Sequence, residues 1–328
     1  MKKQLLGIFI VLFFACCACA QDRSVPNALR PFDKNRPPEP RNSGGGMNYL
    51  GGPVFEAAPT IYIVWYGDWT AKDKRIVDYY FAHLGGSTQN KINSTYSDSN
   101  NKFVPNLVKH SVQNDYHDNY SLGKSLSGDA QIQQIVADAI SGGHLPGNSN
   151  GVYFVLTYTD VTDQGFCSQF CGYHGSSSIV SGKIIKYAMV GNPDQCKSGC
   201  ETSYILGDTG SPNNDPGADG TTAIMWHEFS ETMSDPEVNV DTTWESGVCG
   251  ESGDCCAWLF GKVKKDSHEH LYTNVIGGKG MRHAGDGETS IQEPARKRSL
   301  RLQKRVLVIS SGGFVPSTIV LALLWAGV

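Results

Sequence analysis

The segment Trp226–Glu231 combines an imidazole and two carboxylates at a spacing that suits metal chemistry. In an α-helix, residues four positions apart lie on the same face, so His227 and Glu231 could bind one metal ion. Glu228 lies beside them, where a hydrolase would need its general base. This is the His-Glu-x-x-His arrangement of zinc peptidases with the second His replaced by Glu, and zinc accepts both nitrogen and carboxylate oxygen. A surface helix with solvated carboxylates would carry the same motif, so the motif alone leaves both interpretations open.

The N-terminus has the pattern of a secretory signal peptide, which we predict over residues 1–20. Lys2 and Lys3 supply the positive charge, Leu5–Phe14 is almost continuously apolar, and Ala18–Ala20 gives a small-residue cleavage site. The apolar run is short for a membrane span and a polar segment follows it, so cleavage is favoured over anchoring. We therefore expect a secreted protein, extracellular or in the cell wall, without a stable membrane span.

Composition divides the remaining chain into three parts. Residues 21–46 are rich in Pro, Arg, Asn and Gly and are expected to form a flexible linker. Residues 47–282 are long enough for one domain with a sizeable core. Residues 283–328 join a basic cluster to a short apolar end and are predicted to be an atypical, disordered tail. The formal net charge of −4 gives no reason to expect nucleic acid as a partner.

Export also bears on the cysteines and on glycosylation. In an oxidising compartment most of the cysteines should form disulfides, although the two Cys-x3-Cys pairs would also suit zinc. The odd number leaves one thiol over, or its partner is missing from the chain. In a eukaryote, Asn93 and Asn119 would each begin a motif for N-glycosylation. The seven cysteines after the signal peptide are Cys167, Cys171, Cys196, Cys200, Cys249, Cys255 and Cys256.

Apolar runs rich in β-branched and aromatic residues predict three buried strands, at Ile61–Tyr66, Gly151–Thr157 and Ile184–Val190. The segment Gly165–Gly182 lies between the last two strands. It is rich in Cys, Gly and Ser, and we expect a loop that a disulfide orders.

Apolar residues at helical spacing predict helices at Thr70–Leu84, with Thr70 as the cap, and at Val104–Val112 and Asp129–Ile140. The helix of the metal motif should be capped by Asp219 or Thr221, and it should end near Asp235 because Pro236 follows. This order of elements predicts a single mixed α/β domain, with a central mixed sheet, flanking helices and disulfide-stapled loops. The fold would be zincin-like if the helix binds zinc.

A set of motifs occurs in a fixed order along residues 47–260: Met47–Val54, Ile63–Trp69, Tyr120–Lys124, Val152–Thr157 with Asp160 and Val161, Gly165–Cys167, Cys171–His174, and Val190–Asn192 with Cys196 and Cys200. Together they resemble the EXORDIUM, or phosphate-induced protein, family. The resemblance implies a secreted, extracellular or cell-wall protein, linked in plants to growth and to responses to hormone and nutrient status. It implies no established catalytic reaction.

The metal motif departs from the plant pattern of that family, which usually has small apolar residues at this place. The chain is more similar to microbial or algal relatives, in which His-Glu-x-x-Glu is followed by a segment such as Met233–Pro236 and then by an acidic segment such as Glu251–Cys255. A zincin of the Glu-ligand class takes its third metal ligand from such a downstream Glu. The resemblance therefore makes Glu251 the first candidate for the third ligand and Asp254 the second.

Other histidines are weaker candidates. His174 lies between glycines beside Cys171 and could approach the same site, but a loop His next to a disulfide more often forms local hydrogen bonds. His268 and His270 lie in an exposed, Lys-rich stretch.

The aromatic residues Trp65, Tyr66 and Trp69 could stack on wall sugars, although strand aromatics more often fill the core. The sequence shows no Gly-x-Ser-x-Gly elbow between a predicted strand and a following helix, no phosphate-binding loop and no dinucleotide fingerprint.

Two functional hypotheses follow. The first is a secreted EXORDIUM-like protein that binds an unknown extracellular protein or wall polysaccharide in growth or wall-related signalling. The second is a secreted, peptidase-like zinc hydrolase. In this hypothesis His227, Glu231 and Glu251 would hold zinc, and Glu228 would activate water.

Overall fold

The computed structural model describes residues 28–35, 46–180, 182–238 and 240–282. The predicted signal peptide and C-terminal tail lie outside these residues, as does most of the predicted linker. In the described part of the chain, no helix combines the length and the apolar character that a membrane crossing requires.

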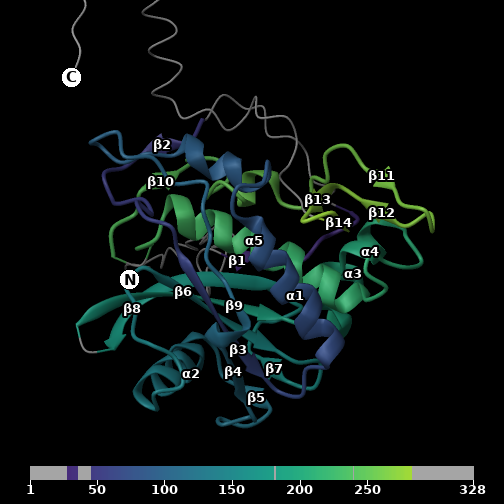
Figure 1. Cartoon of the computed structure of the whole chain (residues 1–328), viewed down its shortest axis with the longest axis horizontal. Coiled ribbons are helices and arrows are strands. Elements are labelled where there is room, and N and C mark those ends of the chain that lie inside the picture. The colour runs from purple at the N-terminus through teal and green to yellow at the C-terminus, as the bar shows by residue number, and fades with distance from the viewer. Residues whose placement is uncertain (1–27, 36–45, 181, 239, 283–328) are drawn as a thin grey trace, which may run out of the picture.

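A six-stranded mixed sheet forms the centre of the molecule (Figure 1). Strands β4, β3, β6 and β9 run parallel to one another, while β8 is antiparallel to β9 and β1 is antiparallel to β8. This arrangement confirms the predicted mixed sheet with flanking helices. In spatial order the strands are β1 (Ala28–Leu29), β8 (Gly172–Val180), β9 (Lys183–Gly191), β6 (Gly151–Thr157), β3 (Thr60–Tyr66) and β4 (Asp115–Asp118).

Helices pack on both faces of the sheet. Successive side chains of a strand point to opposite sides, so each strand contributes to a core on either face. Ile61, Ile63 and Trp65 of β3 pack with residues of α1 (Ala71–Leu84) and α5 (Pro216–Ser234) in one core cluster. The alternate residues of β3 pack with α2 (Asp129–Ser141) in a second cluster. The sheet therefore separates α2 from the layer that contains α1 and α5 (Figure 1).

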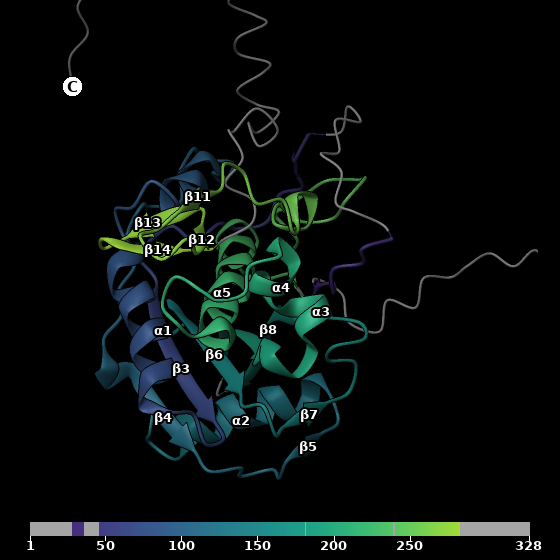
Figure 2. The same ribbon diagram turned by 90° about the vertical axis from the view of Figure 1, so that its right-hand side faces the viewer.

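Short elements complete the described chain. They are β2 (Asn48–Tyr49), β5 (Ser125–Leu126), β7 (Thr162–Asp163), β10 (Trp244–Glu245), β11 (Lys264–Lys265), β12 (Leu271–Tyr272), β13 (Asn274–Ile276), β14 (Lys279–Met281), α3 (Lys197–Cys200), α4 (Thr202–Leu206) and the 3-10 helices Asn90–Thr95, Val112–Asn114, Pro193–Cys196 and Asp254–Cys256. Figure 2 shows α5 between α1 on one side and α3 and α4 on the other.

The strongly patterned elements agree with the sequence predictions. The three predicted strands are β3, β6 and β9, and two of the predicted helices are α1 and α2. Thr70 caps α1 as expected, since its Oγ1 accepts a hydrogen bond from the Asp73 amide at 3.2 Å and the Asp73 carboxylate accepts one from the Thr70 amide at 3.1 Å.

The predicted helix at Val104–Val112 is wrong. This segment instead runs beside β3, where the Ile61 amide donates to the Lys109 carbonyl at 2.8 Å and the Lys109 amide donates to the Pro59 carbonyl at 2.9 Å. Main-chain pairing with the sheet outweighs the helical spacing of the apolar residues.

The predicted loop Gly165–Gly182 is also partly wrong, because it contains the nine-residue strand β8. Its Gly and Ser residues have little intrinsic preference for a strand, and pairing with β9 on one side and β1 on the other supplies the hydrogen bonds. Strand β1, Ala28–Leu29, lies within the predicted linker and is buried against β8.

The start of α5 differs from the prediction as well. Neither Asp219 nor Thr221 caps the helix; Asp215 does, with its Oδ1 accepting a hydrogen bond from the Ala218 amide at 3.2 Å. Pro216 follows at the first helical position, where a missing amide hydrogen costs nothing. The helix ends at Ser234, as the following Asp235–Pro236 pair predicts.

Three disulfides form, Cys167–Cys196, Cys171–Cys200 and Cys249–Cys255, so the Cys-x3-Cys pairs are not zinc ligands. Cys256, the seventh cysteine, is a buried thiol. Each of the first two disulfides spans 29 positions and ties the start of β8 to the region of α3. A loop of this length corresponds to about 3–4 kcal/mol of stabilisation through the unfolded state. These links hold the start of β8, close to His174, against the region of α3.

The exposure of side chains bears on the expected sugar-binding surface and on the two glycosylation motifs. Trp65, Tyr66 and Trp69 are all less than 5% exposed, which places them in the core and not on a sugar-binding surface. Asn93 is buried and its amide donates to Asn90 at 3.2 Å, so this fold leaves no room for a glycan there. Asn119 is exposed.

Candidate metal centre

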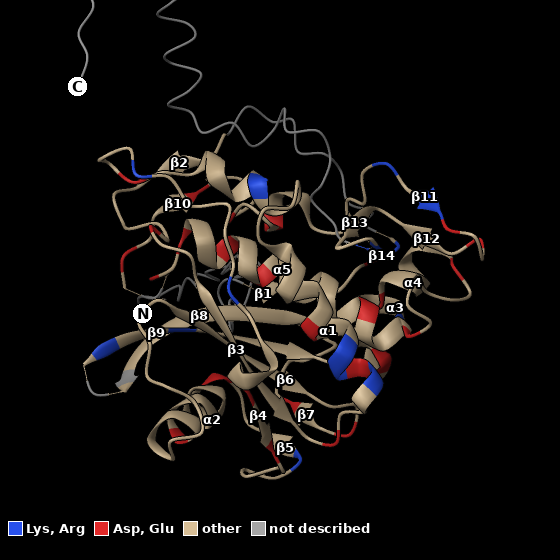
Figure 3. Cartoon of the chain, viewed as in Figure 1, with Lys and Arg blue, Asp and Glu red and all other residues tan. Residues whose placement is uncertain are grey.

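The helix of the metal motif, α5, is buried on all sides. Every residue from Gly217 to Ser234 is buried, and the helix contacts β8, β9 and α1. It carries acidic residues but no Lys or Arg (Figure 3). His227 is 6% exposed, and Glu228 and Glu231 are 0% exposed. The interpretation as a surface helix with solvated carboxylates is therefore excluded.

An inner group forms where β8 faces α5. His174, on β8, places its Nδ1 3.3 Å from Glu228 Oε2 and 3.5 Å from Glu231 Oε2. Its Nε2 lies 3.4 Å from Glu251 Oε1. All four side chains are at most 3% exposed. Both nitrogens of this imidazole thus face carboxylates.

An outer group forms on the same helix. His227 Nε2 lies 3.2 Å from Glu231 Oε1 and 3.6 Å from Asp254 Oδ1, and the Asp254 side chain is 25% exposed. The Asp254 amide donates to Glu231 Oε1 at 2.9 Å. Gly253 permits this approach, because a Cβ at that position would lie 2.6 Å from Glu231 Oε1 and 3.0 Å from the His227 ring.

Glu231 belongs to both groups. In each triad, His174–Glu231–Glu251 and His227–Glu231–Asp254, one potential ligand atom per residue lies within 4.8 Å of the others. The predicted set of His227, Glu231 and Glu251 is thus divided, since Glu251 lies with His174 and His227 lies with Asp254. These buried groups could hold a metal ion.

His174 lies closer to the site than its sequence context indicates. It was expected to form local hydrogen bonds in a loop, but β8 carries it into the inner group. The alternation of side chains along a strand could have revealed this, had the segment been identified as a strand. His268 and His270 join neither triad; His270 Nδ1 lies 3.5 Å from Asp208.

Burial and neighbouring charges shift the protonation of the cluster. Burial raises the pKa of Glu228 to about 7 and that of Glu251 to about 8, against the opposing effect of His174. Burial alone would lower the pKa of His174, but Glu251 and Glu228 raise it well above its usual value. The pKa of His227 is likewise raised, by Glu231 and Asp254 against burial. Without a metal, the cluster therefore retains protons near neutral pH.

Several buried polar atoms of the cluster lack a hydrogen-bond partner among the described residues. No Lys or Arg of the described chain forms an ion pair with these side chains. A buried polar atom without a hydrogen-bond partner destabilises the folded state, so the arrangement favours an added cation. The atoms are His174 Nε2, His227 Nε2, Glu228 Oε1, Glu231 Oε2, and Glu251 Oε1 and Oε2.

A small cavity lies beside the outer group. Its volume is about 10 Å³, which is room for about one water molecule. Its lining residues are Leu29, Thr202, Ala223, His227, Trp258 and Phe260.

Comparison with known proteins identifies the family. Residues 47–280 match the family described as "Phosphate-induced protein 1 conserved region". Among similar proteins, EXORDIUM-like 5 of Arabidopsis thaliana is 31% identical over 242 residues, which is 66% of this chain and 65% of that relative. EXORDIUM-like 3 of Arabidopsis thaliana is 30% identical over 70% of this chain and 74% of its own length. PHOSPHATE-INDUCED 1 of Nicotiana tabacum is 28% identical over 79% of this chain and 83% of its own length.

The match to EXORDIUM-like 5 thus spans slightly less than two thirds of that relative. No solved structure matches the chain. The extent of the family match is decisive: the chain belongs to the EXORDIUM-like, or phosphate-induced protein 1, family.

Proposed function

We propose that this chain is an exported EXORDIUM-like protein that holds a divalent metal ion, by preference zinc, at α5. It acts outside the cell by binding a protein or wall polysaccharide in growth or wall-related signalling. The observation that carries the metal proposal is the buried cluster of two imidazoles and four carboxylates. The family membership carries the extracellular role.

The outer group is the better metal site, because Glu231 and Asp254 both lie close to the same nitrogen, His227 Nε2. Zinc bound tetrahedrally at about 2.0–2.1 Å places its ligand atoms about 3.3 Å apart. The distances from His227 Nε2 to Glu231 and Asp254, 3.2 and 3.6 Å, are close to this value. In the inner group, by contrast, Glu231 and Glu251 face different nitrogens of His174. Asp254 therefore replaces Glu251 as the favoured third ligand.

The charges then balance. A divalent ion at the outer group and a protonated His174 supply three positive charges against the four carboxylates of Glu228, Glu231, Glu251 and Asp254. Glu251, whose pKa burial raises to about 8, can hold a proton and remove the remaining negative charge. Burial of a charged cluster is tolerable only when its charges are matched in this way.

The choice of third ligand can be tested with two isosteric substitutions. Asp254→Asn is expected to lower the zinc content by one equivalent per chain, because it removes a ligand charge. Glu251→Gln should retain that zinc, since Glu251 contacts His174 and not the ion. Elemental analysis after dialysis in zinc-containing buffer measures both. Zinc lost from Glu251→Gln but kept by Asp254→Asn would contradict the assignment and favour Glu251 as the ligand.

A second candidate function is a zinc hydrolase, and the position of Glu228 directly after the ligand His227 on α5 favours it. A general base works best when its pKa lies near the operating pH, and burial brings Glu228 to about 7. Zinc would lower the pKa of a water molecule, and Glu228 would accept its proton. Protein or peptide is the substrate class to test first.

Glu228→Gln separates the two functions. If the protein is a hydrolase, this variant should keep zinc and lose about 10²- to 10⁴-fold in the rate of peptide hydrolysis. Glu245→Gln, outside the cluster, is the control and should leave the rate unchanged. If zinc-loaded wild-type protein cleaves no member of a peptide library, the peptidase function is excluded and the metal is non-catalytic.

A further inference from the structure

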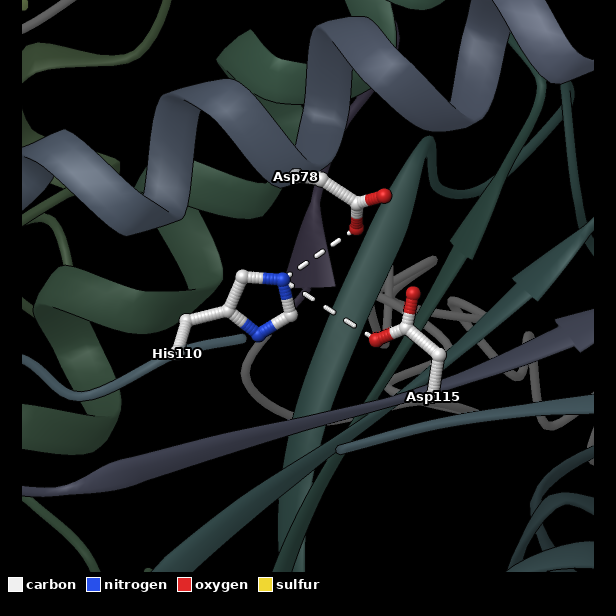
Figure 4. A group of neighbouring side chains, drawn as sticks. All are labelled: Asp78, His110 and Asp115. Atoms are coloured by element: carbon white, nitrogen blue, oxygen red, sulfur yellow. Dashed lines mark hydrogen bonds and ion pairs between the residues drawn. The ribbon is translucent and has the colours of Figure 1, made fainter. Parts of the chain in front are cut away.

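A second group of potential ligands lies at the edge of the sheet, under α1. It consists of Asp78 on α1, His110 in the segment beside β3, and Asp115 at the start of the edge strand β4. Figure 4 shows both carboxylates directed at the same nitrogen of the imidazole. His110 Nε2 lies 3.2 Å from Asp78 Oδ1 and 3.9 Å from Asp115 Oδ1.

The surroundings orient the three side chains toward one point. His110 Nδ1 lies 3.3 Å from the Ile61 carbonyl, to which it can only donate, so in the neutral ring the lone pair belongs to Nε2. Trp65 Nε1 donates to Asp115 Oδ2 at 3.0 Å, which turns Oδ1 toward the imidazole. Metal-binding His and carboxylate residues typically have outer partners of this kind.

The group also has buried polar atoms that a cation would stabilise. Asp115 Oδ1 is buried and has no hydrogen-bond partner among the described residues. A neutral His110 would direct its lone pair at two carboxylates, which is repulsive. A bound cation would accept that lone pair and offset the charge of the two carboxylates.

From this geometry we infer that Asp78, His110 and Asp115 form a second zinc site, which clips α1 to the edge strand β4. One imidazole nitrogen and two carboxylate oxygens are suitable zinc ligands, and a fourth position remains for water. The His110 side chain is 0% exposed, whereas Asp78 and Asp115 are 16% and 13% exposed. An ion can thus enter from the carboxylate side while the imidazole stays in the core.

This site is separate from the centre at α5. Phe81 of α1 lies between them, with its ring 6.1 Å from the His110 ring and 5.9 Å from the Phe229 ring of α5. The two sites share no residue. The second site therefore goes beyond the proposed function, and each site can be present without the other.

Zinc stoichiometry with His110→Asn tests the inference. Asn can still donate to the Ile61 carbonyl but has no counterpart of Nε2, so this variant should lose one zinc. Chelator-stripped, full-length protein is loaded with zinc, dialysed and analysed for metal. We expect two equivalents per chain in the wild type and one in His110→Asn. His117→Asn is the matched control, since His117 is exposed and its Nε2 faces the Gly67 carbonyl; it should keep two.

The possible outcomes are distinct. One equivalent in both wild type and His110→Asn would overturn the second site and leave the centre at α5. One equivalent in the wild type and none in His110→Asn would support the second site and reject the centre at α5. If His110→Asn does not fold, Asp78→Asn gives the same test at a more exposed position. Two equivalents in a folded Asp78→Asn protein would also overturn the inference.

Discussion

Glu231→Gln is expected to remove the metal from the centre at α5 and to lower the free energy of unfolding by about 3–5 kcal/mol. Glu231 is the one residue that belongs to both ligand groups, facing His227 through Oε1 and His174 through Oε2. The substitution keeps the shape of the side chain but removes its charge. The two buried imidazoles would then lose a shared partner, and the ion would lose a ligand. Metal analysis and urea unfolding measure the two effects.

Glu269→Gln is the control for this variant, because Glu269 is exposed and forms its ion pair with Lys265 at the surface. Exposed pairs of this kind contribute at most about 1 kcal/mol. A Glu231→Gln protein with the zinc content and stability of the control would show that the carboxylate does not organise a metal centre.

Withdrawal of the metal is expected to have an effect of similar size. An ion that binds only the folded state stabilises it by about 4 kcal/mol when its free concentration is 1,000 times its dissociation constant. A chelator should therefore lower the midpoint of thermal unfolding, and added zinc should restore it. Near-UV circular dichroism can follow the transition, since Trp65, Trp69 and Trp244 are buried in the core.

The His110→Asn variant restricts this measurement to α5, because its second site is removed. In that background the chelator should still destabilise the protein, whereas a protein that also carries Glu231→Gln should not respond. Identical unfolding with chelator and with zinc in the His110→Asn background would contradict a stabilising metal at α5.

The layers of the fold could be predicted from the sequence where local pattern and tertiary pairing agree. Strands β3 and β6 are almost continuous apolar runs, β9 is mainly apolar around Lys186, and α1 begins at a Thr–Asp capping pair. Strand β8 could not be predicted, because its Gly and Ser residues form a strand only through pairing with β9 and β1. That error also hid His174, which sequence reasoning had placed in a loop.

The candidate site was predictable only as far as one helix extends. His227 and Glu231 lie together because helical spacing requires it. The third partner depends on how the chain returns to α5, where close approach at Gly253 brings Asp254 to His227 and leaves Glu251 beside His174. The group of Asp78, His110 and Asp115 has no local motif at all, since α1 and β4 bring its members together.

Elemental analysis of protein that has not been stripped of metal tests the central claim most directly. His110→Asn protein should be purified without chelator, so that any bound ion belongs to α5. We predict about one divalent ion per chain, zinc by preference, and its loss in the Glu231→Gln variant. Protein that carries no divalent metal, and that takes up none when zinc is added after stripping, would contradict a metal centre at α5.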